Sequence, residues 1–311
     1  MQGRHKLNKK FIADFTLLLV VFVWGSTFVI VQDAISFLTP FSFNAIRFFI
    51  AFVILSIIYL VFTKKNKLHF TKESIKSGFI LGTWLCLGYG FQTFGLLYTT
   101  PAKAGFITGL SVVLVPLLSF LLLKYPLNRN IILGVIFAAG GLYMMTMMQS
   151  SSFGFGDFLV LLCAVSFAMH IIMTSKYAAK YHAIPLTILQ IGVVSLLSFI
   201  GSLLFEQPGK MYQLDVLLQP EVVIGLLVTA ILATAFAFLA QTYFQAYTSP
   251  TRVALIFALE PVFAALTSYF VINEAFTASM IAGCTLILAG IILAEWPVKT
   301  STKLQDQHHS H

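Results

Sequence analysis

Glu260 is the residue of this sequence whose surroundings most clearly demand a chemical explanation. It lies inside the apolar segment Val253–Asn273, and Pro261 follows it directly. A carboxylate near the centre of a membrane-spanning helix costs at least about 2.5 kcal/mol, so it is expected to face a cavity or a partner. A carboxyl group held there can gain or lose a proton as its surroundings change, which proton coupling requires. The alternative is a static hydrogen bond to backbone that Pro261 leaves open.

Four further residues in apolar segments carry groups suited to binding a polar solute. Gln92 and Gln241 are neutral and occupy equivalent positions in two similar halves of the chain, which suits hydrogen bonding from two sides of a site. Bridging between helices without a ligand is the alternative for both. His170 is either a proton relay or a satisfied core residue. Trp24 stands before Gly25-Ser26-Thr27, either as the wall of a cavity or beside a packing surface of small residues.

Basic residues give the candidate partners of Glu260. Arg47 lies near a helix end, where a long side chain can snorkel to the interface and act as a structural anchor. Arg47 and His170 are both possible partners from other helices. Arg252 precedes Glu260 by eight residues, about 12 Å along a helix and poorly aligned in azimuth, so we expect no direct pair between them.

The elements that hold these residues are predicted from composition. Of 311 residues, 59% are hydrophobic and only 10% are charged, which is outside the range of soluble domains. A spanning helix needs about 20 largely apolar residues. The segments that qualify are Phe15–Gln32, Phe43–Phe62, Ser77–Ala102, Ala104–Leu123, Asn130–Gly156, Phe158–Ser175, Ala183–Phe205, Val222–Thr251, Val253–Asn273 and Ala275–Ala294. We predict an all-α membrane protein of ten transmembrane helices, since these continuous runs exclude a barrel of alternating strands.

The distribution of positive charge predicts the orientation. If the N-terminus is cytoplasmic, ten helices place the C-terminus there too, and sixteen of the nineteen Lys and Arg residues fall on that side. Only Lys103 and Lys210 fall on the other face, which is the bias that positive-inside insertion produces. The net charge of +8 is therefore an insertion signal with weak attraction to anionic lipid, and it does not indicate nucleic-acid binding.

The chain contains an internal repeat. Gln241–Pro250 echoes Gln92–Pro101 at an offset of 149 residues, whereas Asp157 echoes Asp14 at an offset of 143. The second copy therefore has six extra residues, which we place in the loop Glu206–Glu221. Because five helices per copy is an odd number, the second copy is expected to be inverted in the membrane, with a site near the midplane between the copies.

The expected organisation follows from this repeat. A basic cytoplasmic tail covers 1–13, the first five-helix repeat 14–149, a linker 150–156, the second repeat 157–296 and a cytoplasmic tail 297–311. Lys103 then lies at the outer face and its counterpart Arg252 at the inner face, where both are expected to be structural. The cavity is expected between the first, third, fourth, sixth, eighth and ninth helices.

The two copies differ at positions that bear on coupling. Glu260 matches Ser111, so the mid-membrane carboxylate has no counterpart, and Glu274 matches Tyr125. Pro116 follows Pro101 by fifteen residues, but Pro261 follows Pro250 by eleven. If these prolines break the helices, the break has moved by about one turn between the copies.

The sequence contains no motif for catalysis, for a metal or for a cofactor. Walker, dinucleotide-binding, HExxH and GxSxG patterns are absent, and the histidines of the tail at His308, His309 and His311 do not make a site. The longest hydrophilic segment is about sixteen residues, so any chemistry on a polar solute has to occur inside the helix bundle.

Several of these motifs together resemble the drug/metabolite transporter superfamily, EamA type. The motifs are Trp24-Gly25-Ser26-Thr27-Phe28, Ser249-Pro250-Thr251-Arg252, Leu259-Glu260-Pro261-Val262-Phe263-Ala264-Ala265 and Asn273-Glu274. The resemblance extends from Asp14 to Trp296, although Lys124-Tyr125 stands where such proteins often have an acidic residue. It implies a secondary carrier in the inner membrane that exports amino acids, metabolites or drugs.

The expected function is therefore alternating-access transport of a small molecule, with Trp24, Gln92, His170 and Gln241 as binding residues and Glu260 as the coupling residue. A gradient-driven uniporter is the close alternative. An intramembrane enzyme needs polar groups that converge near one interface, and these scatter around the midplane. A non-transporting subunit is the third alternative. The protein is expected in the plasma membrane as a monomer or homodimer, in contact with lipid and with no cofactor.

Overall fold

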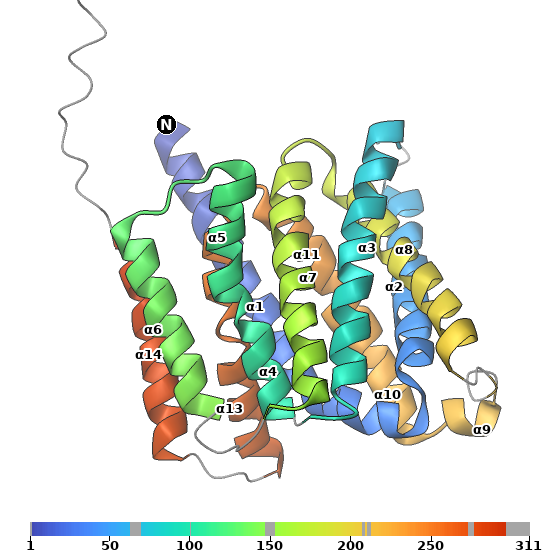
Figure 1. The fold of residues 1–311 in the computed structure, drawn as a ribbon. Helices are drawn as coiled ribbons and strands as arrows, with labels where there is room; N and C mark the ends of the chain where they lie inside the picture. The colour runs from blue at the N-terminus through green and yellow to red at the C-terminus, as the bar shows by residue number, and fades with distance from the viewer. Residues whose placement is uncertain are drawn as a thin grey trace, which may run out of the picture.

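The computed structural model describes residues 2–62, 70–99, 101–146, 153–206, 209, 213–272 and 277–296. Within these ranges the chain forms helices joined by short turns and contains no β-strand (Figure 1). The helices are α1 (Gln2–Phe37), α2 (Pro40–Phe62), α3 (Lys72–Gly95), α4 (Pro101–Gly109), α5 (Ser111–Leu123), α6 (Arg129–Thr146), α7 (Phe155–Ala178), α8 (Ala183–Phe205), α9 (Leu214–Leu217), α10 (Pro220–Val228), π-helix η3 (Thr229–Phe236), α11 (Ala237–Gln245), α12 (Pro250–Phe257), α13 (Glu260–Ile272) and α14 (Ala278–Glu295). An all-helical fold is therefore confirmed.

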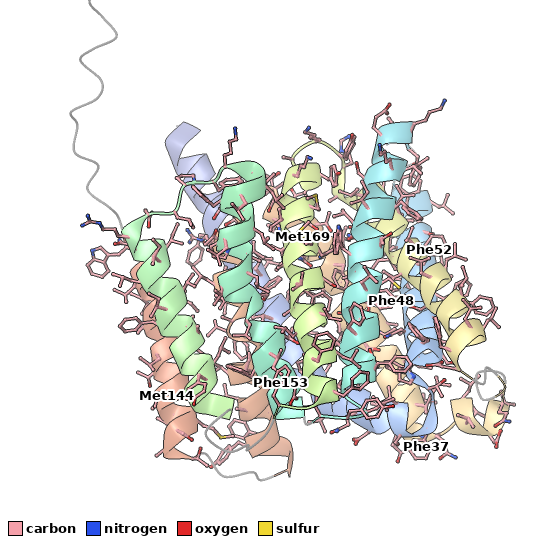
Figure 2. All side chains as sticks on the ribbon, viewed as in Figure 1. Phe37, Phe48, Phe52, Met144, Phe153 and Met169 are labelled. Atoms are coloured by element: carbon pink, nitrogen blue, oxygen red, sulfur yellow. The ribbon has the colours of Figure 1, made fainter. Side chains whose placement is uncertain are left out.

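Seven segments of the described chain are long and apolar enough to cross a membrane. They lie in α1, α2, α4–α5, α7, α8, α10–α11 and α12–α13, and the shorter apolar helices are α6 and α14. Large hydrophobic side chains also cover the outside of the bundle (Figure 2), for example Leu121, which is 69% exposed, and Phe49, which is 58% exposed. An apolar outer surface is what contact with lipid tails requires.

The helix boundaries follow the repeat offsets found in the sequence. Shifting α2 by 143 residues gives the bounds of α8, whereas shifting α5 and α6 by 149 residues gives the bounds of α13 and α14. The offset changes between the end of α8 at Phe205 and the start of α10 at Pro220. The six extra residues therefore lie in this connection, as expected, and α9 forms there.

The position of the helix break corrects one expectation. The fourth helix of the first copy ends at Gly109 and restarts at Ser111, and that of the second copy ends at Phe257 and restarts at Glu260. The breaks are therefore equivalent under the 149-residue offset and have not moved by a turn. Pro116 lies inside α5, while Pro261 occupies the first turn of α13, where the missing N–H is tolerated.

Equivalent helices of the two copies pack against each other in opposite directions. A Cβ atom added at Gly134 of α6 would lie 2.5 Å from the carbonyl oxygen of Gly290 in α14, and one added at Gly141 would lie 2.5 Å from that of Gly283. Because the earlier glycine of α6 faces the later glycine of α14, the two helices are antiparallel. Figure 1 shows them side by side at one edge of the bundle, and α2 packs against α8 in the same way.

The ends of the chain depart from the expected organisation or lie outside the described ranges. The basic segment expected as a tail over 1–13 is helical from Gln2 and continues into the membrane part of α1. Glu274, Lys210, the C-terminal tail over 297–311 and residues 150–152 of the linker lie outside the described residues, and nothing is described of the side chain of Lys103.

Two adjacent glycines of α6 provide a matched test of this packing. Gly141→Ala places a methyl group against the backbone of α14 and is expected to destabilise the protein by about 1–3 kcal/mol. A methyl group added at Gly140 would meet no atom of another helix within 4 Å, so Gly140→Ala is expected to be neutral or stabilising by up to about 1 kcal/mol. Thermal unfolding midpoints of the two purified variants in detergent measure the difference, and equal midpoints would contradict the close packing of α6 and α14.

Candidate functional site

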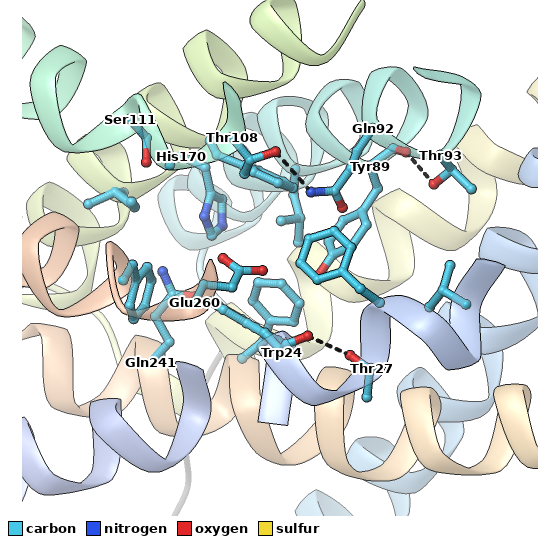
Figure 3. A pocket seen from close by; sticks show the side chains of 18 of the residues that line it. Trp24, Thr27, Tyr89, Gln92, Thr93, Thr108, Ser111, His170, Gln241 and Glu260 are labelled. Atoms are coloured by element: carbon cyan, nitrogen blue, oxygen red, sulfur yellow. Dashed lines mark hydrogen bonds between the residues drawn. The ribbon is translucent and has the colours of Figure 1, made fainter. Parts of the chain in front are cut away.

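A cavity near the middle of the bundle brings together the residues selected from the sequence. Its open space measures about 70 Å³, and its walls come from α1, α2, α3, α4, α5, α7, α11, α12 and α13. The predicted residues that line it are Trp24, Gln92, His170, Gln241 and Glu260 (Figure 3). All the helices expected around the site contribute to it, and α2 contributes Arg47 in addition. The space accepts a small polar group or a few water molecules, so a larger solute needs the cavity to widen.

Glu260 stands at the N-terminus of α13, directly after the break in the ninth apolar segment. Its side chain is directed into the cavity (Figure 3). Gly25 of α1 packs against the backbone at the start of α13, since a Cβ atom added at Gly25 would lie 2.5 Å from the carbonyl oxygen of Glu260. Across the described ranges, no group donates a hydrogen bond to the carboxylate and no cation lies within ion-pair distance of it. The static backbone bond considered for Glu260 is therefore not formed.

Gln241 is held by a chain of hydrogen bonds that fixes the direction of its amide. Gln245 Nε2 donates to the backbone oxygen of Ile171 over 2.5 Å and to the hydroxyl of Ser175 over 2.8 Å. The Oε1 atom of Gln245 then accepts from Gln241 Nε2 over 3.2 Å. Because a carbonyl can only accept, this order leaves Oε1 of Gln241 as the free atom. Gln241 is 1% exposed, and its Oε1 has no hydrogen-bond partner among the described residues.

His170 is hydrogen-bonded within the bundle, as a satisfied core residue would be, and a role in proton relay stays a prediction. Its Nε2 lies 2.8 Å from Oε1 of Gln190, which can only accept, so His170 donates. Gln190 in turn donates to Thr242 over 2.9 Å. The imidazole also packs edge-on against Phe238, with ring centroids 5.9 Å apart. His170 thus joins α7, α8 and α11 at the cavity wall and does not pair with Glu260.

Trp24 is oriented by the π-helix η3, which the sequence did not reveal. Its Nε1 donates to the backbone oxygen of Ala233 over 2.8 Å. A π-turn interrupts the regular i→i−4 ladder, and such turns are frequent at functional sites. The indole ring packs against Phe257 and Phe238 with centroid separations of 5.0 and 5.3 Å. Trp24 therefore forms a fixed wall of the cavity.

Arg47 lies inside the bundle, which corrects the expectation that it snorkels. It is 3% exposed, and its Nε and Nη2 donate to the hydroxyl of Thr234 over 3.2 and 3.1 Å. The guanidinium also lies over the rings of Tyr89 and Phe48, at 4.7 and 5.0 Å from their centroids. Aromatic faces and a hydroxyl replace a carboxylate as its partners. Arg47 therefore lies at the cavity and not at the membrane interface, and its structural role stays a prediction.

Three residues that line the cavity, Tyr89, Thr93 and Thr108, were not selected from the sequence. Gln92 donates to Thr108 of α4 over 3.3 Å, and Asn44 of α2 donates to Thr93 of α3 over 3.0 Å. Tyr89 lies one turn before Thr93 and lines the cavity. The signal that would have identified Tyr89 is its position at i−3 from Gln92, which places both on one face of α3.

Polar contacts join the helices at both ends of the bundle. Arg252 of α12 forms a bidentate ion pair with Asp14 of α1, with Nη2 to Oδ2 at 2.6 Å and Nε to Oδ1 at 2.9 Å. At the opposite end, Thr99 donates a hydrogen bond to Asp157 of α7. Asp14 and Asp157 are equivalent under the repeat. As expected, Arg252 does not pair with Glu260.

A second hollow differs in chemistry. It lies between α2 and α8 and is lined almost entirely by apolar side chains. Its one hydroxyl, on Ser195, already donates to the backbone oxygen of Ala45 over 3.1 Å. This hollow therefore offers no polar group for recognition.

Comparison with known proteins adds family information to this geometry. The family model described as the EamA-like transporter family matches residues 11–147 and again residues 154–296. The chain is 36% identical over 292 residues to an uncharacterized transporter of Archaeoglobus fulgidus, covering 94% of this chain and 88% of that protein. It is 28% identical over 286 residues to the uncharacterized transporter YoaV of Bacillus subtilis, covering 88% and 93%. One solved crystal structure shares the fold, with a TM-score of 0.74 over 91% of this chain and 96% of its own at 19% identity.

The ion pair between α1 and α12 can be tested by a double-mutant cycle. Asp14→Asn and Arg252→Gln each remove one charge, and the side chains are 19% and 20% exposed. Because the pair is only partly shielded from solvent, we expect a coupling energy of about 1 kcal/mol. Unfolding midpoints of the wild type, both single variants and the double variant measure this coupling. Strictly additive shifts would show that the two charges do not interact.

Proposed function

This chain belongs to the EamA-like transporter family, and we propose that it is a secondary transporter that carries a small solute by alternating access. It is a multi-pass membrane protein of the plasma membrane. The observation that carries the proposal is the position of Glu260, whose carboxylate faces a cavity in the middle of the bundle and has no partner among the described residues. An ionisable group at such a site is typical of solute and proton pathways.

We further propose that the chain crosses the membrane ten times as two inverted repeats, with both termini cytoplasmic. Three observations support this arrangement. The family model matches twice, the helix bounds repeat at the sequence offsets, and the equivalent helices α6 and α14 are antiparallel. In inverted repeats the site lies between the copies near the midplane. The cavity fits this position, since both copies contribute to its walls.

Alternating access needs the two ends of the bundle to open in turn. The Asp14–Arg252 ion pair fastens α1 to α12 at the N-terminal end, which we assign to the cytoplasmic side. The Thr99–Asp157 hydrogen bond ties the turn after α3 to α7 at the other end. We propose that each contact breaks when its own end opens. The cavity lies within one chain, so a monomer contains the whole path and a homodimer would contain two.

Glu260 is the group to which we assign proton coupling. The other titratable side chains that line the same cavity are Arg47, Tyr89 and His170, and each is engaged with other partners. A proton on Glu260 removes the charge of a carboxylate that has no ion-pair partner among the described residues. Loading and release of solute are then linked to release and uptake of a proton, which drives export when the gradient points inward. A uniporter would share the same architecture but would not need this proton.

Reconstituted transport tests the coupling. A rescue screen against toxic amino acids, amines and drugs first identifies a solute. In proteoliposomes, Glu260→Gln is expected to reduce flux driven by a pH gradient at least tenfold, because the amide cannot exchange a proton. Glu221→Gln, on the exposed first turn of α10, serves as control and is expected to transport normally. Intact pH-driven flux in Glu260→Gln would leave uniport as the function.

Labelling of single cysteines tests the topology. In a background without Cys86, Cys163 and Cys284, Gln213→Cys lies in the connection between α8 and α10, and Pro126→Cys in that between α5 and α6. An impermeant maleimide is expected to label position 213 in intact cells, and position 126 only after permeabilisation. Labelling of both positions in intact cells would exclude the ten-helix arrangement.

A further inference from the structure

The nitrogen-bearing side chains that line the cavity each donate at least one hydrogen bond within the bundle. Trp24 Nε1 donates to Ala233, Gln92 Nε2 to Thr108, and Gln241 Nε2 to Gln245. Arg47 also lines the cavity, and its Nε and Nη2 donate to Thr234. A solute that relied on these nitrogens would have to displace existing hydrogen bonds, which costs the desolvation of each group left unpaired.

Two acceptor groups at the cavity have no donor among the described residues. Both carboxylate oxygens of Glu260 face the cavity without a donor in the described chain, and Gln241 Oε1 is buried without one. The orientation of Gln241 is not a free choice, because the chain through Gln245 ends at the backbone oxygen of Ile171. A buried acceptor with no donor is costly, so a water molecule, an ion or the N–H group of a ligand is expected to donate to it.

Aromatic rings surround these acceptors. Trp24 packs against Phe257 and Phe238, and Tyr89 packs against Phe167 at a centroid distance of 5.3 Å. All five rings belong to residues that line the cavity. Aromatic faces attract a cation and also accept an apolar body. A second carboxylate in this space would be repelled by Glu260, and in a medium of low dielectric that repulsion is large.

Resting on the proposed transport function, we propose that the solute is a protonated amine that bears N–H donors on an aromatic or apolar body and has no carboxylate. Its ammonium group donates to Glu260 and to Oε1 of Gln241. One ammonium and one proton then occupy the Glu260 carboxylate in turn. When the ammonium leaves, a proton takes its place, so that each cycle exchanges one monovalent cation for another.

A series of four compounds tests the recognition on the unmodified protein. Binding to the purified full chain is measured by isothermal titration calorimetry with phenethylamine, N-acetylphenethylamine, N,N,N-trimethylphenethylammonium and phenylalanine. We expect phenethylamine to bind at least tenfold more tightly than each of the other three. The acetyl compound lacks the charge, the trimethyl compound lacks N–H donors, and phenylalanine adds a carboxylate. Equal binding by any of these three, or no measurable binding of phenethylamine at millimolar concentration, overturns the proposal.

Two variants locate the recognition in the cavity. Glu260→Gln is expected to weaken phenethylamine binding at least tenfold, and Gln241→Leu about threefold or more, as loss of a charged and of a neutral acceptor implies. Glu221→Gln is the matched control and is expected to bind normally. Unchanged binding in both cavity variants overturns the proposal.

The same measurements separate this inference from the proposed function. Binding is measured at equilibrium and needs no transport. If amines do not bind while pH-driven flux of another solute depends on Glu260, the inference is wrong and the transport function stands. If amines bind as expected but the reconstituted protein moves no solute, the transport function is wrong and the amine site stands.

Discussion

The structure depends on one constraint: polar groups inside an apolar bundle have to find partners within the chain, because neither lipid nor bulk water supplies them. Most polar side chains at the centre meet it. Gln245 serves two acceptors and one donor, Gln190 links His170 to Thr242, and Arg47 uses a hydroxyl and two aromatic rings. Glu260 and Oε1 of Gln241 have no such partner among the described residues, and Oδ1 of Asn44 is a further buried acceptor without one.

Much of the fold was predictable from the sequence because two patterns, the apolar runs and the internal repeat, indicate the same helices. Apolar runs marked the helices, and the repeat offsets of 143 and 149 residues predicted where equivalent helices begin and end. The expectation that proved wrong concerned the positions of the helix breaks. Pro116 and Pro261 were read as the points of helix breakage, but a proline in the first turn is compatible with a helix, and Gly109 and Ala258 stand where the helices end or the turn begins.

The candidate site was predictable in part, for a related reason. Trp24, Gln92, His170, Gln241 and Glu260 each place a polar group in an apolar segment, and such groups gather where several helices meet. The side chain of Arg47 was predicted to reach the interface, but a residue near a helix end can also point into the bundle. Which direction it takes depends on the helices that lie beside α2. The π-helix η3 left no mark in its sequence of alanine, threonine and apolar residues. Within η3, the carbonyl of Ala233 and the hydroxyl of Thr234 accept hydrogen bonds from Trp24 and Arg47, which only the folded structure brings close.

The close packing of α6 against α14 also limits how these two helices can move relative to each other. Where backbone touches backbone at Gly134 and Gly141, a shift of one residue in either helix would bring side chains into the contact. We therefore expect α6 and α14 to keep their relative position and to act as a rigid connection between the two copies. Neither helix lines the cavity. If the bundle opens by alternating access as proposed, the helices around Glu260 are therefore expected to move relative to a fixed α6–α14 pair.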